Sequence, residues 1–199
     1  IPVNTSGVRG EWLVPKGANM NRRMLYIHGG AFIVGSPLSH RAITTYYANM
    51  IGGPVLSLDY SLSPESRRQA GIDDCRNAYR WLLGNSPTEP SAAETLFISG
   101  DSAGGNLALM LSAWVRDSRL QAPNAVVALS PLTDATLSSP SMRENIPTDK
   151  MLGPVLGKLG KTPNWILSWT AWFTARIAPS HPRVSPVMGD LGGLPPTLV

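Results

Sequence analysis

A serine between glycines is the first feature of this sequence that could do chemistry. Residues 100–104 read Gly-Asp-Ser-Ala-Gly, with Ser102 at the centre. This G-x-S-x-G pattern is typical of a nucleophilic serine on a sharp turn between a strand and a helix, where larger residues two positions away would collide. A serine hydroxyl is a weak nucleophile until a base removes its proton. Ser102 is therefore our candidate catalytic nucleophile.

A second stretch, His-Gly-Gly-Ala at positions 28–31, could supply backbone hydrogen-bond donors for acyl transfer. The tetrahedral intermediate of acyl transfer carries an oxyanion that preorganised N–H groups stabilise. The N–H of Ala103, directly after the nucleophile, is one natural donor, and a loop after an earlier strand supplies the others. We expect the N–H groups of Gly29, Gly30 and Ala103 to form this oxyanion hole.

Two other glycine patterns lack what phosphate binding requires. Residues 30–36 read G-x-x-x-x-G-S, which has the glycine spacing of a P-loop, but the lysine that would contact the phosphates is absent. Residues 100–105 do not have the G-x-G-x-x-G spacing of a dinucleotide site. We therefore predict no nucleotide, and the expected chemistry needs no metal or organic cofactor.

The elements that must position these residues follow from the hydrophobic pattern. Nearly continuous apolar runs predict buried parallel strands at 23–28, 54–60, 95–99 and 125–130. Helical spacing of apolar residues predicts helices at 41–51, 71–83 and 102–116. Strand and helix alternate, which predicts an α/β fold with a doubly wound, mostly parallel sheet flanked by helices. An alternating run at 8–14 predicts an antiparallel strand near one edge.

The alternation stops after Asp134. Residues 135–183 are rich in Ser, Pro and Thr and then carry apolar helical patterns around 151–159 and 165–177, with Trp165, Trp169 and Trp172 on one face. These aromatic residues either cover the core or line a substrate pocket beneath a lid. We predict a core of residues 1–134 and 184–199, interrupted by a helical cap insertion at 135–183.

Composition limits the possible partners. The 199 residues carry a formal charge of +4, but the basic residues are scattered and form no stripe for nucleic acid. The apolar runs are shorter than the roughly 20 residues that a membrane span needs. Charged residues make up 15%, against roughly 25% in an average domain, so some surface is expected to be covered by a cap or by a second copy in a homodimer. A lone Cys75 favours a reducing compartment, and we expect a cytoplasmic protein.

Several stretches together resemble one known group, the bacterial hormone-sensitive-lipase-like carboxylesterases of the α/β-hydrolase fold. They lie in family order and read HGGAFIVGS (28–36), LDYSLSPE (58–65), DDC and AYRWL (within 73–83), GDSAGGNLA (100–108), SPLTD (130–134) and VSPVMGDLGGLPPTLV (184–199). The resemblance implies a serine carboxylic-ester hydrolase that acts on small to medium acyl esters through an acyl-enzyme. It gives Ser102 the role of nucleophile and Asp101 that of ordering the surrounding loop.

The chain departs from this family pattern in a few positions. Residues 66–70 (SRRQA) replace a stretch that commonly contains proline and aromatic residues, and Ala31 stands where a third glycine is common. The resemblance places the triad Asp and His after the strand that residues 194–199 begin, and a helical cap segment before Ile1. We therefore expect the sequence to be truncated at both ends, with both triad partners beyond Val199.

The polar residues inside the chain do not offer a clear substitute for these partners. The resemblance suggests that His28 holds the backbone of its loop, and His40 and His181 are best explained as polar loop residues. Asp134 follows the strand after the nucleophile helix, where it acts either as a turn cap or as a triad acid. Two alternatives to an esterase stay open, a non-catalytic ligand-binding protein on the same fold and an amide or peptide hydrolase.

Overall fold

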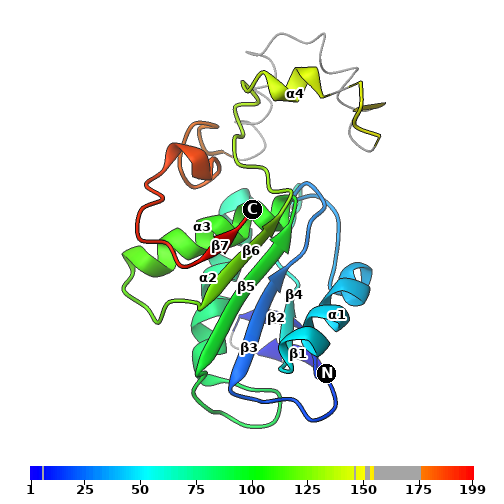
Figure 1. Cartoon of the computed structure of the whole chain (residues 1–199), viewed down its shortest axis with the longest axis vertical. Helices are drawn as coiled ribbons and strands as arrows, with labels where there is room; N and C mark the ends of the chain where they lie inside the picture. Colours follow the sequence, from blue (N-terminus) through cyan, green and yellow to red (C-terminus); the bar gives the residue numbers. More distant parts are fainter. Residues whose placement is uncertain (6, 146, 151–152, 155–175) are drawn as a thin grey trace.

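The fold is built on one open, twisted sheet. The computed structural model describes residues 1–5, 7–145, 147–150, 153–154 and 176–199. Within these residues seven strands pair in the order β1-β2-β4-β3-β5-β6-β7 (Figure 1). They are β1 (Pro2–Thr5), β2 (Val8–Leu13), β3 (Arg22–Ile27), β4 (Val55–Leu58), β5 (Thr95–Asp101), β6 (Ala125–Leu129) and β7 (Thr197–Leu198). The pairs β1–β2 and β2–β4 are antiparallel, and the other pairs are parallel.

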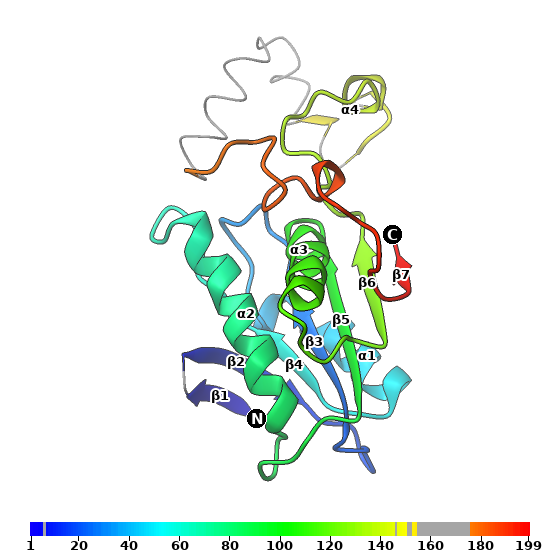
Figure 2. The same ribbon diagram turned by 90° about the vertical axis from the view of Figure 1, so that its left-hand side faces the viewer.

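Three main helices cover the two faces of this sheet. Helix α1 (Arg41–Ile51) lies on one face, and helices α2 (Arg68–Gly84) and α3 (Ala103–Asp117) lie together on the other (Figure 2). Shorter helices are η1 (Leu38–His40), α4 (Ser141–Glu144) and η2 (Pro186–Met188). The sheet is therefore doubly wound and mostly parallel.

Strand β3 explains why the sheet strands read as continuous apolar runs. Its side chains alternate between the two faces, as in any strand. Met24 and Tyr26 join the core under α1, whereas Leu25 and Ile27 join the larger core under α2 and α3. Because both faces are covered, the four residues from Met24 to Ile27 are all apolar or aromatic.

A buried cation on β3, Arg23, is hydrogen-bonded to the C-terminal end of α2. The Arg23 side chain is fully buried and donates hydrogen bonds of 2.9 Å to the carbonyl oxygens of Leu82 and Ser91. It also donates to the Met20 carbonyl oxygen at 2.7 Å. Leu82 lies in the last turn of α2 and Ser91 in the connection from α2 to β5, so Arg23 satisfies polar groups that would otherwise be buried without partners.

The sequence-based prediction of the fold is confirmed. The four parallel strands and three helices occur at the predicted positions within a few residues, and β2 is the antiparallel strand near one edge. The edge strand itself, β1, was not predicted. Helix α2 begins at Arg68, three residues before the predicted start.

The proposed cap stays a prediction. The described residues between 135 and 183 lie beyond the carboxyl ends of the parallel strands, with α4 among them (Figure 1). Most of the two apolar patterns, and all three tryptophans, fall at positions outside the described residues. In the part of the chain that the structure describes, no helix is both long and apolar enough to cross a membrane.

Candidate active site

Ser102 sits at a strained turn between β5 and α3. Its backbone has φ 50° and ψ −113°, a conformation that a non-glycine residue adopts only when its surroundings enforce it. The Ser102 N–H donates to the Leu129 carbonyl oxygen at 2.8 Å, and the Leu132 N–H donates to the Ser102 carbonyl oxygen at 3.3 Å. Both bonds join the turn to β6 and the loop after it, and thereby hold the serine in this conformation.

The flanking glycines are required because backbone approaches them closely. A Cβ atom on Gly100 would lie 2.5 Å from the Gly104 carbonyl and 2.6 Å from the Ile27 carbonyl oxygen. A Cβ atom on Gly104 would overlap the Ile27 carbonyl oxygen. These distances are far below a van der Waals contact, so the steric reason expected from the G-x-S-x-G pattern holds here.

Asp101 joins the turn at Ser102 to the loop after β3. Its Oδ1 accepts a 2.9 Å hydrogen bond from the Gly29 N–H and a 2.7 Å bond from the Tyr26 hydroxyl. The Nε2 atom of His40 lies 3.5 Å from Oδ2 of the same carboxylate. A Cβ atom on Gly29 would overlap the Asp101 carboxylate, which explains the glycine at that position. Asp101 therefore orders the loop, in line with the role expected for it.

The predicted oxyanion donors are not equivalent in the structure. The Gly29 N–H is already hydrogen-bonded to Asp101, so it is not a free donor. Within the described residues, no backbone acceptor is assigned to the N–H groups of Gly30, Ala31 or Ala103 outside regular secondary structure. Ala103 opens α3, where the first N–H groups lack acceptors in the helix. Gly30 has φ 116°, and a Cβ atom there would overlap the Val34 carbonyl oxygen.

His28 holds the same loop from the inside of the protein. Its Nδ1–H donates to the Gly29 carbonyl oxygen at 2.7 Å, and its ring stacks on Tyr60 with centroids 4.4 Å apart. The Tyr60 hydroxyl donates to the His28 carbonyl oxygen at 2.9 Å. Burial lowers the pKa of His28 and thereby favours the neutral form of the ring. Its Nε2 is buried with no hydrogen-bond partner in the described part of the chain.

The other two histidines also have partners away from the nucleophile. His40 Nδ1 lies 2.9 Å from the Ser39 hydroxyl, and His181 Nδ1 accepts a 3.1 Å bond from the Arg183 N–H. Across the described ranges, no histidine hydrogen-bonds to the Ser102 hydroxyl, and the remaining positions contain no histidine. Among the described residues, therefore, no histidine is hydrogen-bonded to Ser102 as a base.

Asp134 caps its own turn. Its Oδ1 accepts bonds from the Thr136 N–H at 2.8 Å and the Thr136 hydroxyl at 2.5 Å, and its Oδ2 accepts one from the Ser138 hydroxyl at 3.2 Å. Burial alone would raise the pKa of Asp134, but these hydrogen bonds outweigh it and lower the pKa. Cys75 lies in the core, where burial raises its thiol pKa to about 12, so it is not a nucleophile.

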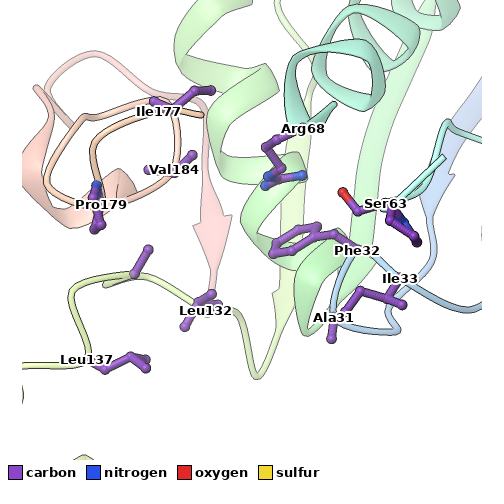
Figure 3. Close-up of a pocket in the computed structure, with 12 residues that line it drawn as sticks. Ala31, Phe32, Ile33, Ser63, Arg68, Leu132, Leu137, Ile177, Pro179 and Val184 are labelled. Atoms are coloured by element: carbon purple, nitrogen blue, oxygen red, sulfur yellow. The ribbon is translucent and has the colours of Figure 1, made fainter. Parts of the chain in front are cut away.

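A pocket of about 440 Å³ opens next to the loop after Gly30 (Figure 3). Ala31 and Phe32 form one wall, and Leu132 forms part of another. The lining is apolar apart from Ser63 and Arg68. A volume of this size is within the range of small-molecule sites.

Arg68 is the residue of this pocket that our sequence analysis missed. Residues 66–70 depart from the family pattern, but the sequence alone assigns no role to Arg68. Arg68 stands four residues before Ile72, and Ile72 belongs to the buried face of α2 with Cys75 and Tyr79. A cation that extends the apolar face of a helix was the signal that could have identified it, because such positions seldom carry an unpaired charge.

Comparisons with known proteins agree with this geometry. The model of the alpha/beta hydrolase fold family matches residues 24–199. An esterase from Acinetobacter venetianus is 38% identical over 200 residues, covering all of this chain and 61% of that protein. An acetyl-hydrolase from Streptomyces hygroscopicus is 34% identical over 190 residues, covering 95% of this chain and 58% of that protein.

A solved structure also resembles this chain. A hormone-sensitive-lipase homologue from a metagenome library, EstE7, superposes with a TM-score of 0.83 at 33% identity and covers 99% of this chain and 63% of its own. The chain spans 58% to 61% of the length of the esterase and acetyl-hydrolase relatives. Fold, motif order and these relatives agree, and the chain belongs to the α/β-hydrolase fold family.

Proposed function

We propose that the protein containing this chain is a serine carboxylic-ester hydrolase that acts on small to medium acyl esters. The observation that carries the proposal is the strained turn that places Ser102 directly before the N-terminus of α3. The esterase and acetyl-hydrolase names of its relatives support the same reaction class.

The reaction begins when the Ser102 hydroxyl attacks the ester carbonyl carbon. The Ser102 proton passes to a histidine base, the carbon becomes tetrahedral, and the alcohol leaves with a proton to give an acyl-enzyme. Water then attacks the acyl-enzyme in the same way, releasing the carboxylic acid and restoring the serine. The triad His and Asp are proposed to follow residue 199, since the three histidines described above are engaged elsewhere.

The oxyanion would be stabilised by N–H groups of Gly30, Ala31 and Ala103. This differs from the sequence-based expectation in one residue, because the Gly29 N–H is engaged by Asp101. Gly29 then keeps a structural role: it allows the loop to lie against the Asp101 carboxylate. The N-terminus of α3 adds a positive partial charge near the developing oxyanion.

The first test of this proposal is Ser102→Ala in the whole protein. Hydrolysis of 4-nitrophenyl butyrate should fall on the order of 10⁴-fold or more, because no acyl-enzyme can form. Ser118→Ala, at an exposed position after α3, is the matched control and should keep the full rate. Near-UV circular dichroism would check that both variants keep the fold.

Two other outcomes would decide between the remaining alternatives. A wild-type protein that binds esters without turnover would indicate a non-catalytic binding protein. Faster hydrolysis of an anilide than of the matched ester would indicate an amide hydrolase. An unchanged ester rate in Ser102→Ala would refute the assignment of the nucleophile.

A further inference from the structure

Arg68 carries a charge into the protein interior. Only 6% of the residue is exposed, although it stands at the first position of α2. Burial lowers its pKa to about 10, so the guanidinium remains protonated at neutral pH. A buried charge is costly unless an opposite charge or several hydrogen bonds compensate it.

The chain gives this cation no carboxylate partner. Among the described residues no Asp or Glu forms an ion pair with Arg68, and the remaining positions contain no acidic residue. Its contacts are neutral: Nη2 donates to Asn106 Oδ1 at 2.6 Å, and the guanidinium carbon lies 3.4 Å from the centre of the Phe32 ring.

The free side of the guanidinium faces the apolar pocket. Figure 3 shows Arg68 pointing toward Phe32 at the pocket wall, with Leu132 across the cavity. Arg68 is the one charged residue among the described residues that line the pocket. A guanidinium has five N–H donors in a planar fork that matches the two oxygens of a carboxylate. One hydrogen bond to Asn106 leaves most of this fork available.

Residues that line the pocket also contact or follow the segments that we propose as the active site. Leu132, in the lining, donates its N–H to the Ser102 carbonyl oxygen, and Ala31, on the opposite wall, follows the proposed oxyanion donor Gly30. A substrate whose ester carbonyl is attacked by Ser102 can therefore extend one of its chains into this cavity.

We propose that Arg68 makes the enzyme selective for esters that carry a carboxylate at the end of a short apolar chain. This inference rests on the proposed function. The apolar walls would cover the methylene groups, and the guanidinium would bind the terminal carboxylate. Hydrolysis adds one water across the ester bond and gives an acid and an alcohol. The remote carboxylate is unchanged in the product that carries it.

Two pairs of substrates test this selectivity in the whole, unmodified protein. The first pair is the mono-4-nitrophenyl ester of adipic acid and the analogue whose free carboxylate is a carboxamide. The second pair is the butyryl ester of 4-hydroxybutyrate and that of 4-hydroxybutyramide. The pairs separate a carboxylate on the acyl side from one on the alcohol side. We expect kcat/KM to favour the carboxylate in one pair by roughly 10- to 100-fold, the range of one charge-assisted hydrogen bond. No preference in either pair would overturn the proposal.

Arg68→Met separates recognition from structural support. The carboxylate-to-carboxamide ratio of kcat/KM should fall by roughly 10- to 100-fold. If Arg68 only supports Asn106 and Phe32, both substrates lose activity alike and the ratio stays unchanged, which would contradict the proposal. Arg67→Met removes a neighbouring exposed cation and is the matched control, with no change in the ratio.

A binding experiment keeps this inference separate from the proposed reaction. Monomethyl adipate, titrated calorimetrically into the Ser102→Ala protein, should bind more tightly than its carboxamide analogue. If the wild type hydrolyses neither ester pair but this binding preference is found, the esterase proposal fails and the carboxylate site stands. If neutral esters are hydrolysed but the preference is absent, the carboxylate site fails and the esterase proposal stands.

Discussion

At the scale of single residues, Asp101 connects the two halves of the candidate active site. It follows Gly100 on β5, yet its carboxylate binds the Gly29 N–H and the Tyr26 hydroxyl of another segment. Hydrogen bonds to an ionised group are among the stronger ones in proteins. Asp101, adjacent to Ser102, therefore positions the loop that carries two of the proposed oxyanion donors, Gly30 and Ala31.

Two substitutions of Asp101 should distinguish the effect of its hydrogen bonds from the effect of its charge. Asp101→Ala removes both bonds and should lower the free energy of unfolding by roughly 2 kcal/mol or more. A displaced loop should also lower kcat about 10- to 100-fold. Asp101→Asn keeps an oxygen acceptor and should lose much less of both quantities. Urea denaturation and ester kinetics measure these effects, and equal losses in the two variants would show that hydrogen bonding is not the cause.

His28 makes a separate prediction about pH. Because burial lowers its pKa below the ordinary value of 6.5, the unfolded state binds the proton more readily than the folded state. The stability that neutral His28 provides is therefore present above about pH 6.5 and is lost as the pH falls below it. In His28→Asn, whose side-chain amide can still donate to the Gly29 carbonyl, the urea midpoint should decline less between pH 7.5 and 5.5. An identical decline in both proteins would show that other groups cause it.

At the scale of elements, close contact between α3 and β3 determines where glycine is needed. Gly104 is the second residue of α3, and a Cβ atom there would overlap the Ile27 and His28 carbonyl oxygens at the end of β3. This contact lets the nucleophile turn and the loop after β3 approach each other.

Replacing glycine by alanine should therefore lower the free energy of unfolding much more in α3 than in α2. Gly104→Ala should lower the free energy of unfolding by about 3 kcal/mol or more, because the clash is with backbone. Gly84→Ala, at the end of α2, meets nothing within 4 Å and should change the free energy of unfolding by less than about 1 kcal/mol. Thermal unfolding of the two variants measures the difference, and similar melting temperatures would contradict the steric argument.

Most elements could be predicted from the sequence because each is locally patterned. The parallel strands are covered on both faces, and the nucleophile turn has a recognisable set of small residues. Edge strand β1 could not be predicted, because its four residues are mostly exposed and its register depends on pairing with β2. The engagement of the Gly29 N–H also depends on a contact 72 residues away, which no local pattern contains.

At the scale of the whole molecule, the same 199 residues hold Ser102, which is the proposed nucleophile, the loop after β3 that carries proposed oxyanion donors, and a pocket. Each of the three histidines has other hydrogen-bond neighbours in the described part of the chain, and none of them is bonded to the Ser102 hydroxyl.

A polypeptide of these 199 residues alone should hydrolyse 4-nitrophenyl butyrate slowly. With no histidine at Ser102, we expect a rate at least about 100-fold below that of the whole protein, because general-base catalysis contributes roughly 10²- to 10⁴-fold. Mass spectrometry should confirm the length of the product before it is assayed. A rate equal to that of the whole protein would mean that one of the three internal histidines serves as the base.

The bond between the Gly29 N–H and Asp101 also has a consequence for exchange with solvent. Gly29 is buried, and its amide proton can reach deuterated water only when the loop separates from the nucleophile turn. The exchange rate of this single amide therefore reports the free energy of opening the site. A bound carboxylate-bearing ester that slows this exchange would show that occupying the pocket also closes the loop.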